Sequence, residues 1–370
     1  MLEESKMADL SVEITGLTLR NPILTAAGPG ARDGETLRAA ARGGAGGLVA
    51  KTVSVRAAEV PTPNIVAVRK GRVGSRRGVL NAELWSELPV EQWLDKEYRT
   101  ALDTGLPVIA SLGYTPEDVA SLAPKIEKAG VHALEFSTHY VGGHVEIAKA
   151  LREAVEIPIF AKLSPKVDVV EVAKSVEPYV DGVVAINSLG PCLRINIETG
   201  KPMLGSESGY GWLSGASIRP VAIRCVADIA RAIRKPVIGV GGVSDGEDAI
   251  EFIMAGAHAV EVCTAAILDG QTVYGRIASE MDKWLDAHGY DSVEDVRGLG
   301  LKHLTKKITF TPPPKVDMEK CTLCGLCEKS CVYEAITTDK EGQELRIDKS
   351  RCQACGMCIS VCPHDALSYN

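Results

Sequence analysis

A chain of 370 residues is too long for one small core and suggests a large α/β domain with a smaller second domain. Hydrophobic residues make up 45% and charged residues 24%, which excludes disordered, collagen-like and low-complexity chains. The net charge is −7, and no basic block with interleaved aromatic residues is present, so the composition argues against nucleic acid and anionic membranes as partners.

The first ten residues are acidic and polar, and they lack the basic segment and apolar core of a secretory signal. No apolar run approaches the ~20 residues that a membrane span needs. The sequence therefore predicts a soluble, cytoplasmic protein.

Short apolar runs alternate with amphipathic stretches of helical period from Asn21 to about Leu268, as expected of repeated βα units. Eight such units predict a (β/α)8 barrel within residues 1–310. The predicted strands lie near Ile23–Ala27, Gly47–Lys51, Pro107–Ser111, Ala133–Ser137, Ile159–Leu163, Gly182–Asn187, Pro236–Val240 and Ala259–Cys263.

The loops after the seventh and eighth strands of such a barrel often bind a phosphate group. Gly241 and Gly242 follow the seventh predicted strand, and Cys263 and Thr264 follow the eighth. These residues offer close backbone approach, amide donors and a hydroxyl group. A tight turn that merely requires glycine is the alternative interpretation.

A proline run at residues 311–315 stiffens the approach to the C-terminal segment, because consecutive prolines favour an extended backbone. We place the domain boundary there, so that the second domain spans residues 311–370. Only Cys192, Cys225 and Cys263 precede it, whereas the other eight cysteines are concentrated in the last fifty residues.

The C-terminal cysteines form two C-x2-C-x2-C-x3-C runs, and Pro363 completes the bacterial ferredoxin pattern after the second. A [4Fe–4S] cube needs four thiolates, and in two-cluster folds the last cysteine of each run binds the other cluster. The spacing therefore predicts one cluster on Cys321, Cys324, Cys327 and Cys362, and a second on Cys352, Cys355, Cys358 and Cys331. Disulfides or zinc sites are the alternatives, and Val332 replaces the proline of the first run without removing a ligand.

The barrel segment resembles dihydroorotate dehydrogenase and the FMN-binding part of dihydropyrimidine dehydrogenase over nearly its whole length. With the two-cluster tail, the chain is similar to the FMN- and iron–sulfur-containing subunit of bacterial NAD-dependent dihydropyrimidine dehydrogenases. The motifs that carry the resemblance occur in order: Asn21-Pro22, Ala26-Ala27-Gly28, Lys51-Thr52, Asn81, Ala161-Lys162-Leu163, Asn187-Ser188, the run from Ser214 to Pro220, and Gly241-Gly242-Val243.

This resemblance implies a set of FMN-binding residues. Lys162 would lie near the pyrimidine edge of the flavin ring, where a fixed cation stabilises the negative charge of the reduced ring; a salt-bridged barrel lysine is the alternative. Asn81 and Asn187, with Ser188, would also hydrogen-bond the substrate ring, unless they are loop residues that cap turns. The remaining cofactor contacts would be Ala26, Ala27, Gly28, Lys51 and Thr52 at the ring, and Gly215, Gly241, Gly242, Cys263 and Thr264 at the phosphate end.

The match breaks after the fourth predicted strand. Ser137 replaces the family's substrate-binding asparagine, and Tyr140 aligns with the catalytic cysteine. Tyr140 or His139 could donate a proton to substrate carbon, or both could simply close the mouth of the barrel. Cys192, in the loop after the sixth strand, could supply a thiol instead, although free cysteines are more often buried as small hydrophobic residues. Cys225 is predicted to pack on a helix.

The favoured function is an FMN-dependent oxidoreductase acting on a CH–CH or conjugated C=C bond of a small substrate, for which a pyrimidine-like compound is one candidate, with the clusters relaying single electrons. The alternative is an electron-transfer subunit whose flavin is only a relay. No G-x-G-x-x-G follows a predicted strand, so the expected electron partner is a separate FAD- and NAD-binding subunit or a ferredoxin. A homo- or hetero-oligomer is expected.

Overall fold

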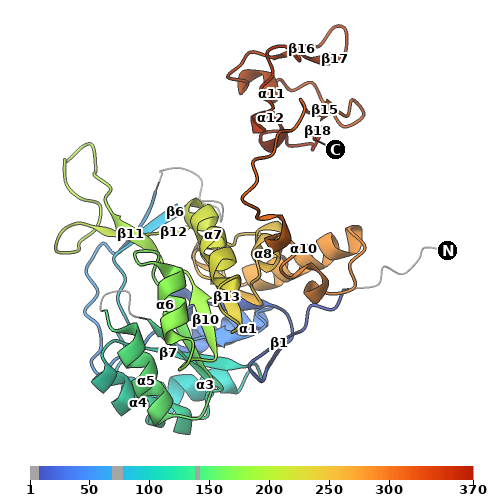
Figure 1. Ribbon diagram of the computed structural model, residues 1–370. Helices are drawn as coiled ribbons and strands as arrows, with labels where there is room; N and C mark the ends of the chain where they lie inside the picture. Colours follow the sequence, from blue (N-terminus) through green and yellow to red (C-terminus); the bar gives the residue numbers. More distant parts are fainter. Residues whose placement is uncertain (1–7, 69–77, 138–141, 370) are drawn as a thin grey trace. The chain divides into compact units, whose positions relative to one another are not determined.

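The computed structural model describes residues 8–68, 78–137 and 142–369. Contacts between residues divide the chain into two compact units, Met1–Leu304 and Thr305–Asn370. This division falls a few residues before the proline run at 311–315. Figure 1 shows both units, coloured along the sequence. Each unit is described by itself below.

The first unit is built on eight parallel strands in the order β3-β14-β13-β10-β9-β8-β7-β4. A parallel bridge between Leu24 and Gly47 joins the two outermost strands of that order and closes the sheet into a barrel. The predicted fold class is confirmed, because every predicted strand is present. Their bounds are β3 Ile23–Thr25, β4 Leu48–Val49, β7 Val108–Leu112, β8 Ala133–Ser137, β9 Ile159–Leu163, β10 Gly182–Ala185, β13 Val237–Val240 and β14 Ala259–Val262.

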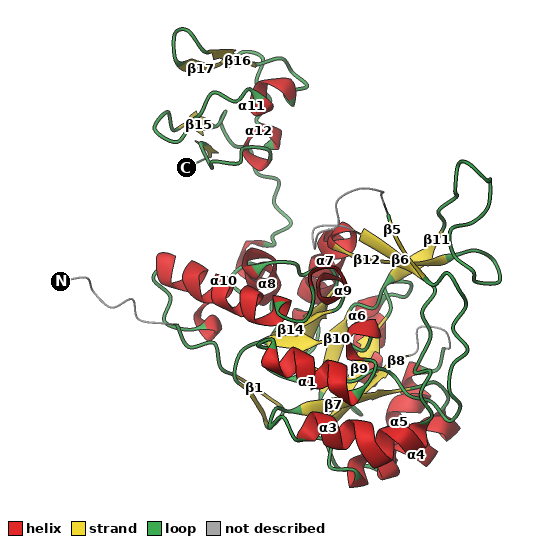
Figure 2. Ribbon diagram, turned by 180° about the vertical axis from the view of Figure 1, so that it is seen from behind, coloured by secondary structure: helices red, strands yellow, loops and turns green. Residues whose placement is uncertain are grey.

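Helices surround these strands, as Figure 2 shows. Asp33, Thr115, Asp168 and Asp245 begin four of the longer helices, each accepting a hydrogen bond from a backbone N–H of the first turn. The apolar face of each helix is buried against the barrel. The helices are α1 Gly34–Arg42, α2 Val90–Gln92, α3 Tyr98–Leu102, α4 Pro116–Lys128, α5 His144–Ala154, α6 Val169–Val176, α7 Arg219–Ala230, α8 Gly246–Met254, α9 Thr264–Asp269 and α10 Val273–Ala287.

Two smaller sheets complete the first unit. The hairpin of β1 (Val12–Ile14) and β2 (Leu17–Leu19) contributes four buried side chains to the main core. A four-stranded antiparallel sheet has the order β11-β12-β6-β5. Its strands are β5 Ile65–Ala67, β6 Gly78–Asn81, β11 Leu189–Cys192 and β12 Gly211–Gly215.

The second unit is a small fold around buried thiols. Cys327 and Cys358 pack with Ile336, Leu345 and Leu367 in its core. Its elements are β15 Lys315–Val316, α11 Leu326–Lys329, β16 Ile336–Asp339, β17 Glu344–Ile347, α12 Met357–Ser360 and β18 Leu367–Ser368.

The backbone of this unit repeats after 31 positions, the interval from Cys321 to Cys352. Both cysteine runs take the left-handed backbone region at equivalent places, which are Leu323 and Ala354, Gly325 and Gly356, and Glu334 and Asp365. Each run also has a short helix at the same point, α11 or α12.

Within the described ranges of the whole chain, we find no helix of the length and apolarity that crossing a bilayer requires.

Candidate active site

A single cleft at the C-terminal ends of the barrel strands brings the predicted FMN and substrate residues together. Its lining includes every one of them that the structure describes. His139 and Tyr140 lie outside the described residues. The predicted residues in the lining are Ala26, Ala27, Gly28, Lys51, Thr52, Asn81, Ser137, Lys162, Asn187, Ser188, Gly215, Gly241, Gly242, Cys263 and Thr264.

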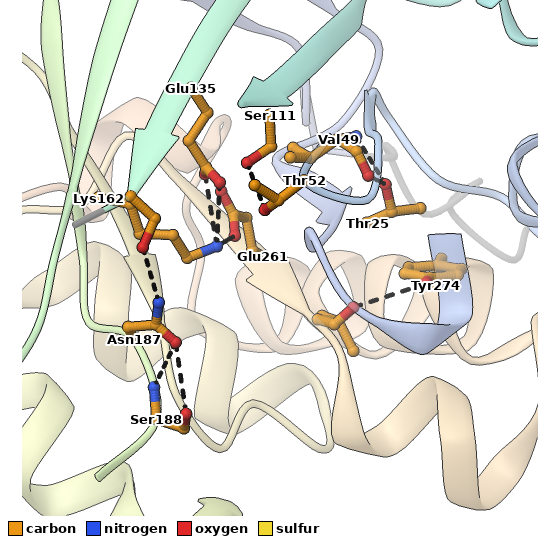
Figure 3. Close-up of polar contacts among 12 residues, drawn as sticks. Thr25, Val49, Thr52, Ser111, Glu135, Lys162, Asn187, Ser188, Glu261 and Tyr274 are labelled. Carbon is orange, nitrogen blue, oxygen red and sulfur yellow. Dashed lines mark hydrogen bonds and ion pairs between the residues drawn. The ribbon is translucent and has the colours of Figure 1, made fainter. Parts of the chain in front are cut away.

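Lys162 stands between two buried carboxylates at the base of this cleft (Figure 3). Its Nζ lies 2.5 Å from Oε2 of Glu261 and 3.4 Å from Oε2 of Glu135. These side chains come from β9, β14 and β8, and all three residues are at most 6% exposed. Lys162 is thus the salt-bridged barrel lysine of the alternative interpretation, and it lines the cleft as well.

Burial and charge act in opposite directions on these groups. Burial alone would lower the pKa of Lys162, but the charges of Glu135 and Glu261 outweigh it and raise that pKa. Burial, followed by the nearby charge of Glu135, raises the pKa of Glu261 well above its usual value. Lys162 therefore stays protonated, whereas Glu261 resists ionisation.

A second buried lysine lines the same cleft. Lys51, which is 2% exposed, pairs with the carboxylate of Glu83. The other oxygen of that carboxylate accepts a hydrogen bond from Nδ2 of Asn64, over 2.5 Å. The two lysines place buried ammonium groups in one cleft, where such groups can stabilise an anionic cofactor ring, and a carboxylate holds each of them in place.

Each of the two cleft asparagines makes one hydrogen bond to a residue just ahead in the sequence and one to a distant residue. Nδ2 of Asn187 donates to Oγ of Ser137 over 3.0 Å, and its Oδ1 accepts from the backbone N–H of Ser188 over 2.8 Å. Asn81 accepts from the backbone N–H of Glu83 and donates to the carbonyl of Trp212. The bonds from the N–H groups of Ser188 and Glu83 are those expected of turn-capping residues, whereas the bonds to Ser137 and Trp212 reach other strands, and both asparagines also line the cleft. Their role toward a substrate stays a prediction.

The glycines at the predicted phosphate end form a cradle that side chains would fill. Gly215, Gly241 and Gly242 have φ values of 80°, 131° and 96°, which L residues rarely adopt. A Cβ on residue 242 would lie 2.8 Å from the carbonyl oxygen of Gly215. The hydroxyl of Thr264 bonds that of Ser214 over 2.9 Å beside them. Backbone and hydroxyl donors around an open cradle fit a phosphate group, so the cleft as a whole fits FMN.

Two other cysteines of the first unit serve packing. Cys192, on β11, packs against the small apolar cluster of Leu80, Ala82 and Leu204, and it is not among the described residues of the cleft. Cys225 is buried on α7, as predicted for a packing residue. A role of the Cys192 thiol in the reaction stays a prediction.

The thiols of the second unit fit iron–sulfur clusters better than disulfides. All eleven cysteines of the chain fall within the described ranges, and all are free thiols. Cys321, Cys324, Cys327 and Cys362 line one small cavity, which is the crossed combination expected for a single cluster. Backbone N–H groups of Ala335 and Ala366 lie 3.3 and 3.4 Å from the sulfurs of Cys331 and Cys362. Such contacts stabilise thiolate ligands of a cluster.

Comparison with known proteins supports both units. Residues 9–285 match the dihydroorotate dehydrogenase family model, and residues 320–366 match the 4Fe-4S dicluster domain model. A relative from Methanothermobacter thermautotrophicus, named dihydroorotate dehydrogenase B (NAD(+)), catalytic subunit, is 37% identical over 78% of this chain and 98% of its own length. Proteins of the same name from Pyrococcus abyssi and Geobacter sulfurreducens are 34% and 35% identical, over 79% and 78% of this chain and 99% and 97% of their own lengths.

A parallel barrel with this cleft, joined to a [4Fe–4S] ferredoxin-like domain, defines an iron–sulfur flavoprotein of the oxidoreductase class. The chain belongs to the dihydroorotate dehydrogenase family. It is accordingly an FMN-dependent oxidoreductase acting on CH–CH bonds.

The sequence interpretation missed the acidic residues of the cleft. Glu83, Glu135 and Glu261 all line it. For Glu135 and Glu261 a signal was present, because each lies inside an otherwise apolar predicted strand, as Lys162 does. A charge at such a position is costly unless it is paired, so the three charges could have been recognised as partners. Glu83 stands in a loop and gives no comparable signal.

Proposed function

We propose that this chain binds FMN in the barrel cleft and two [4Fe–4S] clusters in the C-terminal unit, and that it interconverts a CH–CH and a C=C bond in a small, conjugated, pyrimidine-like substrate. The observation that carries the proposal is the single cleft, which combines the glycine cradle of Gly241 and Gly242 with the buried cations Lys51 and Lys162. FMN, when bound, would supply hydride transfer and the step from two-electron to one-electron chemistry.

Different residues of the cleft would bind FMN, orient the substrate and transfer the proton. Gly215, Gly241, Gly242 and Thr264 would hold the phosphate end, and Lys162 would stabilise negative charge at the pyrimidine edge of the ring. Asn81, Ser137, Asn187 and Ser188 would orient the substrate. Tyr140 or His139 would transfer the proton at the substrate carbon. The remaining cleft residues, Ala26, Ala27, Gly28, Lys51, Thr52 and Cys263, would contact the flavin.

We propose an FAD- and NAD-binding subunit or a ferredoxin as the electron partner of the clusters. The relatives are named as catalytic subunits of NAD(+) enzymes, which supports a separate protein that handles the nicotinamide. A homo-oligomer or a hetero-oligomer with that subunit would follow.

The decisive experiment mixes anaerobically purified protein with dihydrouracil, dihydroorotate or simple enoates and follows the flavin absorbance by stopped flow, with no partner present. We expect reduction or reoxidation of the flavin by at least one of these compounds. Tyr140→Phe and His139→Ala are tested alongside, because loss of turnover in only one of them would identify the proton donor. A flavin that exchanges electrons with the clusters but with none of these compounds would favour the relay function. Protein without extractable FMN or iron would contradict both functions.

A further inference from the structure

The second carboxylate beside Lys162 has no evident use in holding a flavin. One carboxylate would suffice to pair with the lysine, yet Glu135 and Glu261 both face it, from strands on different sides of the barrel. Oε1 of Glu261 is buried and accepts no hydrogen bond from any described residue. An unpaired oxygen on a fully ionised buried carboxylate would be costly.

The charges around Glu261 explain how this cost is avoided. Glu135 faces Glu261 from β8 and Lys162 faces it from β9, and Cys263 comes directly after the end of β14. Lys51 and Glu83 lie further along the same cleft and neutralise one another. If Glu135 and Glu261 were both ionised, these two residues and Lys162 together would carry a net negative charge in a buried site that water does not solvate. A proton kept on the pair makes the group neutral.

We propose that Glu135 and Glu261 share one proton and act as positioning residues that set how strongly Lys162 attracts electrons to the flavin. This inference rests on the proposed FMN site. The pair keeps a single negative charge, which offsets the charge of Lys162. The flavin is thereby harder to reduce than it would be beside a free lysine, and it gives up electrons more readily to the clusters. The raised pKa of Glu261 has the direction that this sharing requires.

The shared proton can be tested without FMN. A protonated carboxyl group has an infrared C=O stretching band that shifts in heavy water and that an ionised group lacks. We expect such a band in the full chain at neutral pH, and we expect both Glu135→Gln and Glu261→Gln to remove it, because the remaining carboxylate then pairs with Lys162 alone. Glu97→Gln is the matched control: Glu97 is also buried, but burial is outweighed by bonds from Gln92 and Gly34, so its pKa is lowered. Absence of a band that responds to both cleft variants would overturn the proposal.

The effect on the flavin is tested by sulfite, which adds to the oxidised ring and leaves negative charge on it. In FMN-loaded protein we expect each single variant to change the sulfite Kd by less than about threefold, because glutamine resembles the neutral acid that it replaces. The double variant Glu135→Gln/Glu261→Gln frees the charge of Lys162 and should tighten sulfite binding by roughly tenfold or more. Clear tightening in each single variant, with a further step in the double variant, would mean that the pair carries two charges, and no tightening in the double variant would mean that the pair does not act on the flavin. Either result overturns the proposal, whereas failure to retain FMN in the unmodified chain would instead contradict the proposed function.

Discussion

Gly28 and Cys263 lie so close together that a Cβ on residue 28 would stand 2.6 Å from the sulfur of Cys263. Both residues line the cleft, one after β3 and the other after β14. These two strands are neighbours in the barrel. The contact therefore leaves no room for a side chain between the two loops at this side of the cleft.

Gly28→Ala should reduce FMN occupancy, because the new methyl group displaces Cys263 or the loop that carries it. The flavin absorbance per protein measures this occupancy. Gly30→Ala is the matched control, since a Cβ there would meet nothing closer than 3.8 Å. Removing the sulfur in Gly28→Ala/Cys263→Ala should restore most of the FMN, and failure of this rescue would contradict the steric cause.

Lys162→Met should destabilise the barrel by about 3–5 kcal/mol, because it leaves a buried carboxylate without its cation. This loss of stability should become smaller as the pH falls toward 4.5, the ordinary pKa of a glutamate, because protonation of the buried carboxylate then removes its unpaired charge. Chemical denaturation across this pH range measures the effect. Lys162→Met/Glu135→Gln/Glu261→Gln should recover part of the stability, because no buried charge is left without a cation, and a loss that is independent of pH and of the two glutamates would rule out this explanation.

The crossed ligand sets predict which cysteine substitutions have the same effect. Cys321→Ser and Cys362→Ser should abolish the same cluster signal in electron paramagnetic resonance, because their thiols line one cavity. Cys331→Ser and Cys352→Ser should abolish the other. Each variant should lose roughly half of the iron. Cys192→Ser is the control and should keep all of it, since Cys192 lies in the first unit. Pairing of Cys321 with Cys331 instead would show that the runs do not cross.

His258 should make the barrel less stable in mild acid. Burial, aided by the charge of Arg297, lowers the pKa of His258 from 6.5 to about 4, while its ring accepts a hydrogen bond from the backbone N–H of Val237. Between pH 6.5 and about 4 the imidazole binds a proton in the unfolded chain but not in the folded chain. The free energy of unfolding therefore falls by about 2–3 kcal/mol as the pH drops through this range. His258→Asn should flatten this dependence. Measurements at pH 8, where the ring is neutral in both states, isolate the cost of the substitution itself.

The barrel could be predicted from the sequence because its strands are short apolar runs with turn residues on either side. The predicted strands extend up to two residues beyond the observed ends. Ala26, Lys51 and Cys263 belong to these extensions and lie in the cleft, because the chain turns away from the barrel just where it forms the site. Several residues of the family motifs follow strand ends in the same way, among them Gly28, Thr52 and Gly241, whereas Lys162 lies inside β9.

The partners of the charged residues could not be predicted in the same way. Glu261 and Lys162 are 99 positions apart and lie on strands β14 and β9, which are not neighbours in the sheet. Their contact arises only when the barrel closes, and a linear pattern of strands does not reveal it. The bond from Asn187 to Ser137 is similar, because it joins the loop after β10 to the last residue of β8, and β9 separates these two strands.

The 31-position repeat of the C-terminal unit would give each of the two proposed iron–sulfur sites an internal reference within the same molecule. Where the backbones of the two halves are equivalent, we expect a difference in reduction potential between the two sites to come from positions at which the two repeats have different residues. Val332 and Pro363 form one such mismatch, and Val332 is 78% exposed. Exchanging these two residues would show how far the direction of electron flow depends on a side chain rather than on the shared architecture.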